Sequence, residues 1–183
     1  ADLGVNTLTL TGTDSTGNIG SAQFSLTVLD TIRPVLNTRS ATLYVDGSGN
    51  AVLNPSDVIL SGTDNCSATP LAGLSKSNFN CSNLGGNTVS VTLTDASGNF
   101  RTASASVTVL DTIKPNAIGQ NRTIYLNASG TATITAAQVN NGSTDNCSVQ
   151  SLSISKTNFT AADLGANLVT LTVADQSNNS AQT

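Results

Sequence analysis

The feature that most constrains this chain is an internal repeat with a period of about 80 residues. The octapeptide TVLDTIRP, which ends at Pro34, returns as TVLDTIKP, which ends at Pro115, 81 positions later. Three copies of a longer block, at 1–18, 82–99 and 162–179, align without gaps at offsets of 81 and 80. A chain with such self-similarity is expected to fold the same unit more than once.

The repeat divides the 183 residues into three predicted domains. Residues 1–34 are the C-terminal part of one repeat, residues 35–115 are a complete repeat, and residues 116–183 are a repeat that lacks its last strand. The first residues match an internal block and lack the pattern of a signal peptide, so we expect the chain to begin within a repeat. A period this long suits a small independent domain.

Apolar residues alternate with Thr or Ser within a copy, as at Val89, Val91 and Leu93. This period of two is typical of a strand with one buried face. Turn strings rich in Gly, Asn and Asp separate the strands. About seven short antiparallel strands per copy indicate an immunoglobulin-like sandwich. The predicted fold class is therefore all-β, with tandem immunoglobulin-like β-sandwich repeats arranged end to end.

Aromatic residues make up only 3% of the chain, so the core is expected to consist of Val, Leu, Ile and Ala. Phe79 and Phe159 are the predicted large core residues, whereas Tyr44 and Tyr125 lie between core positions and should face outward. Apolar stretches are only a few residues long, which excludes a transmembrane helix and membrane insertion by one.

Charge and composition also exclude several functions. The net charge of −4 argues against nucleic acid as a partner. The chain has no His, and its eleven acidic residues are all Asp, so the usual residues of general acid–base catalysis are missing. We therefore expect that this segment is not an enzyme.

The strings DNCS, NLGGNTVSVTLTDASGN and TVLDTIKP resemble the hyalin-repeat-like, immunoglobulin-like modules of giant cell-surface repeat adhesins of Bacteroidetes, in particular the SprB-like gliding adhesins. The resemblance covers the whole chain. It implies type IX secretion, an extracellular location at the cell surface, and a stalk or filament that serves adhesion and gliding motility. Its implied partners are neighbouring repeats of the same chain and an external surface or polysaccharide bound by other parts. The alternative is a set of spacer repeats within a secreted multidomain enzyme.

The repeated string DTI(R/K)P is predicted to be the hinge between sandwiches, made stiff by its proline. Strand parity brings the GTDNCS loop and the DASGN turn back to this hinge, so their aspartates should converge there. Carboxylate and amide oxygens suit Ca²⁺, although Asp in turns also commonly binds nearby backbone amides. The candidate metal ligands are Asp30, Asp64, Asn65 and Asp95 in one group, and Asp111, Asp145, Asn146 and Asp175 in the other.

The three cysteines divide unequally between the copies. Cys66 and Cys81 belong to one copy, and an oxidising exterior permits a disulfide between them. The last copy keeps Cys147 but has Ala161 at the partner position. Cys147 is then either a buried free thiol or the partner of a cysteine in another chain.

The hinge also contains a possible modification site. DTI at 30–32 and 111–113 resembles the Asp–Ser/Thr–aliphatic acceptor of Bacteroidetes O-glycosylation, which makes Thr31 and Thr112 candidates. Ser15 fits the motif more loosely. A motif of three residues also arises easily in a Thr-rich chain, where these threonines would serve only the hinge.

Overall fold

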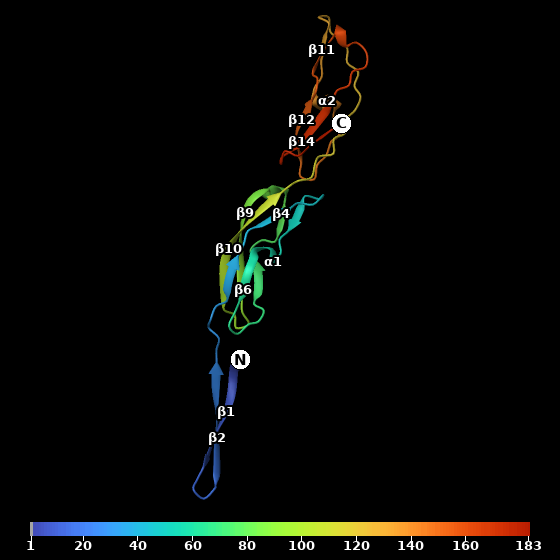
Figure 1. The fold of residues 1–183 in the computed structure, drawn as a ribbon. Coiled ribbons are helices and arrows are strands. Elements are labelled where there is room, and N and C mark those ends of the chain that lie inside the picture. Colours follow the sequence, from blue (N-terminus) through green and yellow to red (C-terminus); the bar gives the residue numbers. More distant parts are fainter. Residues whose placement is uncertain (1) are drawn as a thin grey trace. The chain divides into compact units, whose positions relative to one another are not determined.

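The computed structural model describes residues 2–183 (Figure 1). Strands dominate it, and each helical element has only three or four residues. These short elements are α1 (Pro55–Val58), α2 (Ala136–Val139), and the 3-10 turns η1 (Cys81–Asn83) and η2 (Ala161–Asp163). No helix among the described residues has the length and apolar character needed to cross a membrane. The predicted all-β class with immunoglobulin-like sandwiches is confirmed.

The chain separates into two compact units, and the division passes through the middle repeat. The first unit contains the chain up to Ser40 together with Asn54–Lys76 and Thr88–Ser106. The second contains Ala41–Leu53, Ser77–Asn87 and Val107–Thr183. The domain boundaries that follow from the repeat, after residues 34 and 115, stay a prediction.

The first unit is built from antiparallel pairs. Its N-terminal hairpin pairs β1 with β2, from Gly4 opposite Val28 to Thr13 opposite Ile19. In the middle repeat β3 pairs with β6, and β7 pairs with β9. The strands are β1 (Gly4–Thr13), β2 (Ile19–Val28), β3 (Val35–Thr38), β6 (Ile59–Thr63), β7 (Leu71–Leu74) and β9 (Gly85–Thr94).

The second unit contains the rest of the middle repeat and the last repeat. β4 (Ala41–Tyr44) runs parallel to the end of β10 (Phe100–Leu110), in a sheet of order β4-β10-β9-β7. β5 pairs with β8, β11 pairs with β13, and a three-stranded sheet has the order β12-β14-β15. The strands are β5 (Asn50–Val52), β8 (Asn78–Asn80), β11 (Thr131–Thr133), β12 (Val149–Ile154), β13 (Asn158–Thr160), β14 (Leu171–Asp175) and β15 (Ser180–Gln182).

Equivalent segments of the repeat fold alike. Ala51 lies opposite Phe79 in the β5–β8 pair, and Ala132 lies opposite Phe159 in the β11–β13 pair. Both phenylalanines are buried, as the sequence predicts. Tyr44 and Tyr125 are 60% and 86% exposed, so the predicted outward orientation is also confirmed.

The core of both units is mainly aliphatic, with one buried phenylalanine in each of the middle and last repeats. The last repeat buries a cluster of Ile134, Val139, Phe159, Leu171 and Val173. In the middle repeat the period-two pattern places one face of each long strand inside. Its completely buried valines are Val58, Val89, Val91, Val107 and Val109.

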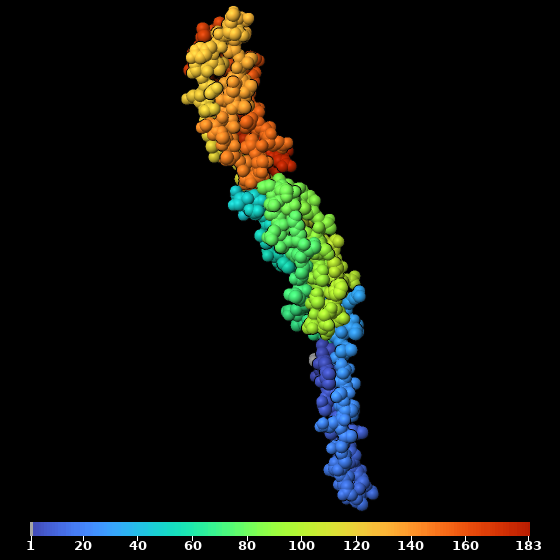
Figure 2. All heavy atoms as spheres, turned by 180° about the vertical axis from the view of Figure 1, so that it is seen from behind, coloured from blue at the N-terminus to red at the C-terminus, as the bar shows by residue number. Residues whose placement is uncertain are grey.

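The N-terminal hairpin lacks such a core. Leu8 and Leu10 are 39% and 65% exposed, whereas Val89 and Val91, their counterparts one period later, have no exposed surface. Figure 2 shows the hairpin in blue with no other element covering the face in view. The remaining elements of the repeat are what cover this apolar face in the middle copy.

Candidate metal sites and the junction between repeats

The first carboxylate cluster consists of Asp30, Asp64 and Asp95, which the sequence predicted would converge. Each aspartate directly follows or closely follows the end of a strand: β2, β6 and β9, respectively. One carboxylate oxygen from each residue lies within 4.8 Å of the other two. The topology therefore brings together three side chains that are 31 to 65 positions apart in the sequence.

The second cluster repeats the first one period later. It consists of Asp111, Asp145 and Asp175, and its three carboxylate oxygens again lie within 4.8 Å of one another. Asp111 and Asp175 are buried, with 5% and 2% of their surfaces exposed. Equivalent hydrogen bonds orient the aspartates of both clusters. The arrangement is therefore a property of the repeat.

The aspartates are held in place by backbone amides. In the second cluster, Asp111 Oδ1 accepts from Ile113 N at 3.0 Å, and Asp145 Oδ2 accepts from Cys147 N at 2.9 Å. In the first cluster, Asp30 Oδ1 accepts from Ile32 N at 3.0 Å and Asp64 Oδ2 from Cys66 N at 2.9 Å. These four aspartates therefore do accept hydrogen bonds from nearby backbone amides, which is the alternative role that the sequence allows.

That role uses only one oxygen of each of these four carboxylates. The other oxygen is buried and has no hydrogen-bond partner in Asp30, Asp64, Asp111 and Asp145. Asn146, whose amide nitrogen lies 3.2 Å from Asp111 Oδ1, also has a buried side-chain oxygen without a hydrogen-bond partner. Buried polar atoms are almost always satisfied, and an isolated buried charge is costly. Each cluster therefore presents buried side-chain oxygens that no protein hydrogen bond satisfies.

The residues present fit Ca²⁺. This ion takes six to eight oxygen ligands at about 2.3–2.6 Å, so ligands on opposite sides of it are about 5 Å apart. The 4.8 Å limit within each cluster matches that span. Three carboxylates would supply the charge in each cluster, whereas in the second cluster it is the amide nitrogen of Asn146, not its oxygen, that lies 3.2 Å from Asp111 Oδ1. Asn65, the counterpart of Asn146, instead has its amide nitrogen 3.0 Å from Cys66 Sγ and is exposed.

Hydrogen bonds and charge also shift ionisation in the first cluster. Burial opposes the charge of Asp95, but hydrogen bonds from the Asn99 side chain and from backbone amides outweigh it and lower the Asp95 pKa. Desolvation raises the pKa of the Cys66 thiol, and the negative charges of Asp30 and Asp64 raise it further. The carboxylate is thus held in its charged form, whereas the thiol is held in its neutral form.

The hinge itself is fastened to the repeat that follows it. Asn99 Nδ2 donates to the Asp30 carbonyl oxygen at 3.1 Å, and Asn179 Nδ2 donates to the Asp111 carbonyl oxygen at the same distance. Pro34 and Pro115, at the ends of the two hinges, are both buried. Asn99 and Asn179 were not predicted to take part in the junction, although their shared position after DASG and DQSN is visible in the repeat. The candidate glycosylation residues Thr31 and Thr112 are exposed.

The predicted Cys66–Cys81 disulfide is wrong. Cys81 is bonded to Cys147, 66 positions away, with a Cα–Cα distance of 5.3 Å. Cys147 is therefore neither a free thiol nor dependent on another chain, and Cys66 is exposed and unbonded. The physical reason is the chain path: β7 leads away from the Asp64 loop and pairs with β9, before β8 pairs with β5 and brings Cys81 to the turn at Gly49. The disulfide joins the middle repeat to the last one.

Other contacts accompany this disulfide. Asn146 Nδ2 lies 3.2 Å from the Asp46 carbonyl oxygen and 3.2 Å from Asp111 Oδ1. Gly49 has a positive φ of 74°, and a Cβ there would lie 2.5 Å from Cys81 Sγ and 2.8 Å from the Asn146 carbonyl oxygen. Only glycine fits this close approach. The turn of one repeat thus receives the loop of the next beside the second aspartate cluster.

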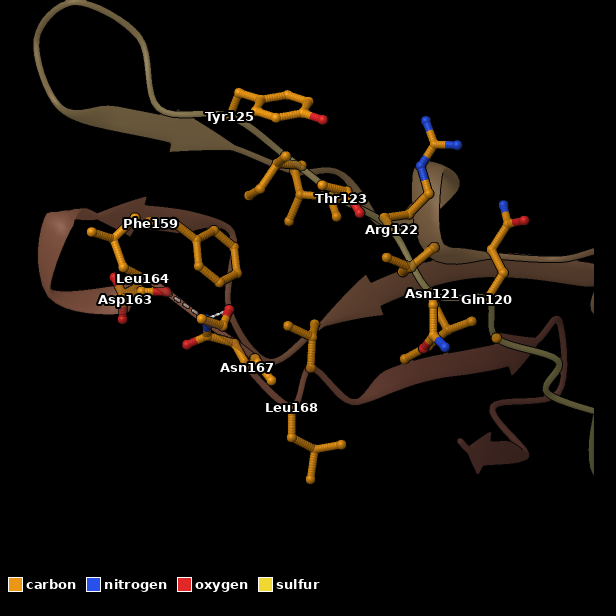
Figure 3. Close-up of a pocket in the computed structure, with 18 of the residues that line it drawn as sticks. Gln120, Asn121, Arg122, Thr123, Tyr125, Phe159, Asp163, Leu164, Asn167 and Leu168 are labelled. Carbon is orange, nitrogen blue, oxygen red and sulfur yellow. Dashed lines mark hydrogen bonds between the residues drawn. The ribbon is translucent and has the colours of Figure 1, made fainter.

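A cleft of 1070 Å³ in the last repeat has a different origin. Figure 3 shows residues from Gln120 to Tyr125 on one wall, and Leu164, Asn167 and Leu168 on the other. In the middle repeat the corresponding segments are β4 and the start of β9, and β10 lies between them in the sheet order. The cleft therefore corresponds to the position of a strand, and we do not assign a small-molecule ligand to it.

Comparison with known proteins gives a partial similarity to an adhesin. The chain is 31% identical over 121 residues to a protein called the serine-rich adhesin for platelets, from Staphylococcus aureus strains USA300 and NCTC 8325. The aligned region covers 56% of this chain but only 5% of each relative's length. No protein-family model matches the chain. The chain is thus similar to a small part of an adhesin.

Proposed function

We propose that this chain is a stalk segment of an extracellular, cell-surface adhesin, and that Ca²⁺ at the head of each repeat fixes the junction to the repeat before it. The observation that carries the proposal is the recurrence of one cluster: Asp30, Asp64 and Asp95 return as Asp111, Asp145 and Asp175. In each cluster the first aspartate belongs to the hinge, and the other two belong to the repeat that follows.

This arrangement suits a mechanical role. A cation bound by the hinge and by two loops of the next repeat would restrict the rotation of the hinge, because bending would break metal–oxygen contacts. When bound, Ca²⁺ would supply positive charge to the unpartnered carboxylate oxygens. At the second junction the disulfide adds a covalent constraint. A row of such junctions would transmit position and force along the chain.

The adhesin similarity supports a function at the cell surface and gives no support to the alternative of an enzyme spacer. The finer proposals extend the resemblance seen in the sequence. They are hyalin-like repeats of a SprB-like gliding adhesin, type IX secretion, and adhesive contact with an external surface or polysaccharide through other parts. We also propose that this segment has no catalytic role, and that Thr31 and Thr112 carry glycans on the exposed side of the hinge.

Small-angle X-ray scattering of this chain, in calcium and in EDTA, tests the proposal. In calcium we expect an extended particle that rises by roughly 40 Å per repeat, from strands of about ten residues at 3.3 Å each plus a hinge. EDTA should broaden the distribution of distances between repeats. Repeats that fold back on each other in both buffers would refute the stalk, whereas identical extended curves would refute only the role of calcium.

A further inference from the structure

The Cys81–Cys147 disulfide joins two surfaces, and the chain carries each of them twice. The first surface, the latch loop, is the Asp-Asn-Cys string at 145–147, whose counterpart one period earlier is 64–66. The second surface, the latch cradle, is the turn at 46–49 together with position 81. Its counterpart is the turn at 127–130 together with Ala161. In the structure the loop at 145–147 occupies the cradle formed by 46–49 and Cys81. The loop at 64–66 and the cradle formed by 127–130 and Ala161 are the remaining copies.

The unoccupied cradle has the same backbone as the occupied one. Gly49 N donates to Asp46 O at 2.8 Å, and Gly130 N donates to Asn127 O at 2.9 Å. The two glycines have positive φ angles of 74° and 71°. A Cβ at Gly49 would clash with Cys81 and Asn146, whereas a Cβ at Gly130 would meet nothing within 4 Å. The second cradle is therefore already formed and open.

The second loop is also already formed. Asp64 Oδ2 accepts from Cys66 N and Ser67 N at 2.9 Å, as Asp145 Oδ2 accepts from Cys147 N and Ser148 N at 2.9 and 3.0 Å. The two loops thus have the same turn, but Cys66 is exposed and is not part of a disulfide.

We propose that this loop and this cradle are two halves of the same latch, and that the partner of each is another repeat of this kind. The loop at 64–66 docks into a cradle of the 46–49 type and forms a disulfide through Cys66 where that cradle contains a cysteine. The cradle at 127–130 receives a loop of the same type without a covalent bond, because Ala161 has no thiol. Disulfide-closed and open junctions then occur in one stalk, according to a single residue in each cradle.

Bond formation in this latch is a two-electron oxidation. The two thiols lose two protons and two electrons as the S–S bond forms, and a disulfide-containing oxidant such as glutathione disulfide is reduced to two thiols.

The test gives the open cradle its missing thiol. Ala161→Cys should make this chain self-complementary, because one molecule then carries a cysteine in its cradle and another offers Cys66. In a glutathione redox buffer we expect a ladder of disulfide-linked oligomers on a non-reducing gel, with Cys66 joined to position 161 in the cross-linked peptide. Docking raises the effective concentration of the two thiols, so oligomers should form at least about tenfold faster than in Ala162→Cys. Ala162 is also exposed and lies one position further along the chain.

Two further variants separate docking from random oxidation. Ala161→Cys combined with Cys66→Ser should give no ladder. Ala161→Cys combined with Gly130→Asn should lose most of the rate advantage, because Asn tolerates the left-handed conformation but places a side chain where the incoming loop must lie. The proposal is overturned if Ala161→Cys and Ala162→Cys oligomerise at equal rates, or if the cross-links join two copies of position 161.

Discussion

Single residues show that two turns with the same hydrogen bonds, at Asp14 and at Asp95, can have different surroundings. Asp14 accepts hydrogen bonds from Thr16 N and Asn18 N, in the same pattern as Asp95 one period later. These bonds lower the pKa of Asp14, with the Asn18 side chain contributing most. Among the described residues, however, Asp14 is not part of a carboxylate cluster, whereas Asp95 is. The turn is thus set by local sequence, whereas the carboxylate cluster is set by the other loops that the fold brings to it.

This contrast yields a matched pair of variants. Asp111→Asn keeps the oxygen that accepts from Ile113 N but removes a negative charge and one proposed calcium ligand from the second cluster. We expect it to reduce the loss of melting temperature that EDTA causes in the parent chain. Asp14→Asn should leave the EDTA effect unchanged, because its oxygens serve only the turn. Differential scanning calorimetry with and without EDTA measures both, and a full EDTA effect in Asp111→Asn would refute the assignment.

The ion pair of Lys156 and Asp163 predicts a pH dependence. The Lys156 side chain is the largest cause of the lowered Asp163 pKa, followed by the Thr160 amide. A lowered pKa stabilises the fold above the ordinary carboxyl value of about 4, and this stabilisation is lost as pH falls through the folded-state value. Lys156→Met should therefore cost stability at pH 7 but not at strongly acidic pH. The loss should be small, because the lysine is 40% exposed and water screens the ion pair.

Urea unfolding at several pH values checks this prediction. A stability loss in Lys156→Met that is constant from pH 2 to pH 7 would contradict the electrostatic explanation.

At the scale of elements, local patterns predicted strands well and short helices poorly. The alternation at Val89, Val91 and Leu93 marks the buried face of β9, and all three residues are buried. The helices α1 and α2 were not predicted, although both begin with a capping box. Asn54 N donates to Asp57 Oδ2 at 2.8 Å, and Thr135 N donates to Gln138 Oε1 at 2.9 Å. The signal was present as a short cap motif, but four residues are too few to show a helical period.

The Cys81–Cys147 disulfide could not be predicted from a single copy of the repeat. Cys66 and Cys81 are close in sequence and belong to one repeat, which favoured their pairing. The bond that forms instead connects a cradle and a loop from successive repeats, and no pattern inside a single copy reports a contact between two copies. The repeat could have suggested it, because Cys147 keeps its place while its supposed partner position contains Ala161.

The corrected pairing makes a prediction about thiols and stability. Labelling of the unreduced, denatured chain should modify Cys66 alone. Cys147→Ser opens a loop of 66 residues and should destabilise the fold substantially, by up to about 4 kcal/mol in the chain-entropy account. Cys66→Ser should change the free energy of unfolding by less than about 0.5 kcal/mol. Equal effects of the two substitutions, or labelling of Cys81, would refute the pairing.

At the scale of the whole molecule, the repeat was the most informative feature of the sequence. Strand parity within one copy predicted that Asp64 and Asp95 meet the hinge at Asp30, and the period predicted that the same geometry recurs at Asp111. Parity is a property of chain direction, so this convergence could be predicted without knowledge of side-chain packing. The hydrogen bonds of Asn99 and Asn179 and the close approach at Gly49 depend on three-dimensional contact and were not predictable in that way.

Isothermal titration of calcium into the metal-free chain measures whether the two aspartate clusters bind Ca²⁺. The two clusters predict two Ca²⁺ ions per chain, with dissociation constants of about 1 mM or tighter, the range of extracellular modules. Asp111→Asn should remove one of the two ions. Absence of binding heat at calcium concentrations well above this range, with the parent chain and the variant behaving alike, would contradict the account and leave these aspartates as turn residues only.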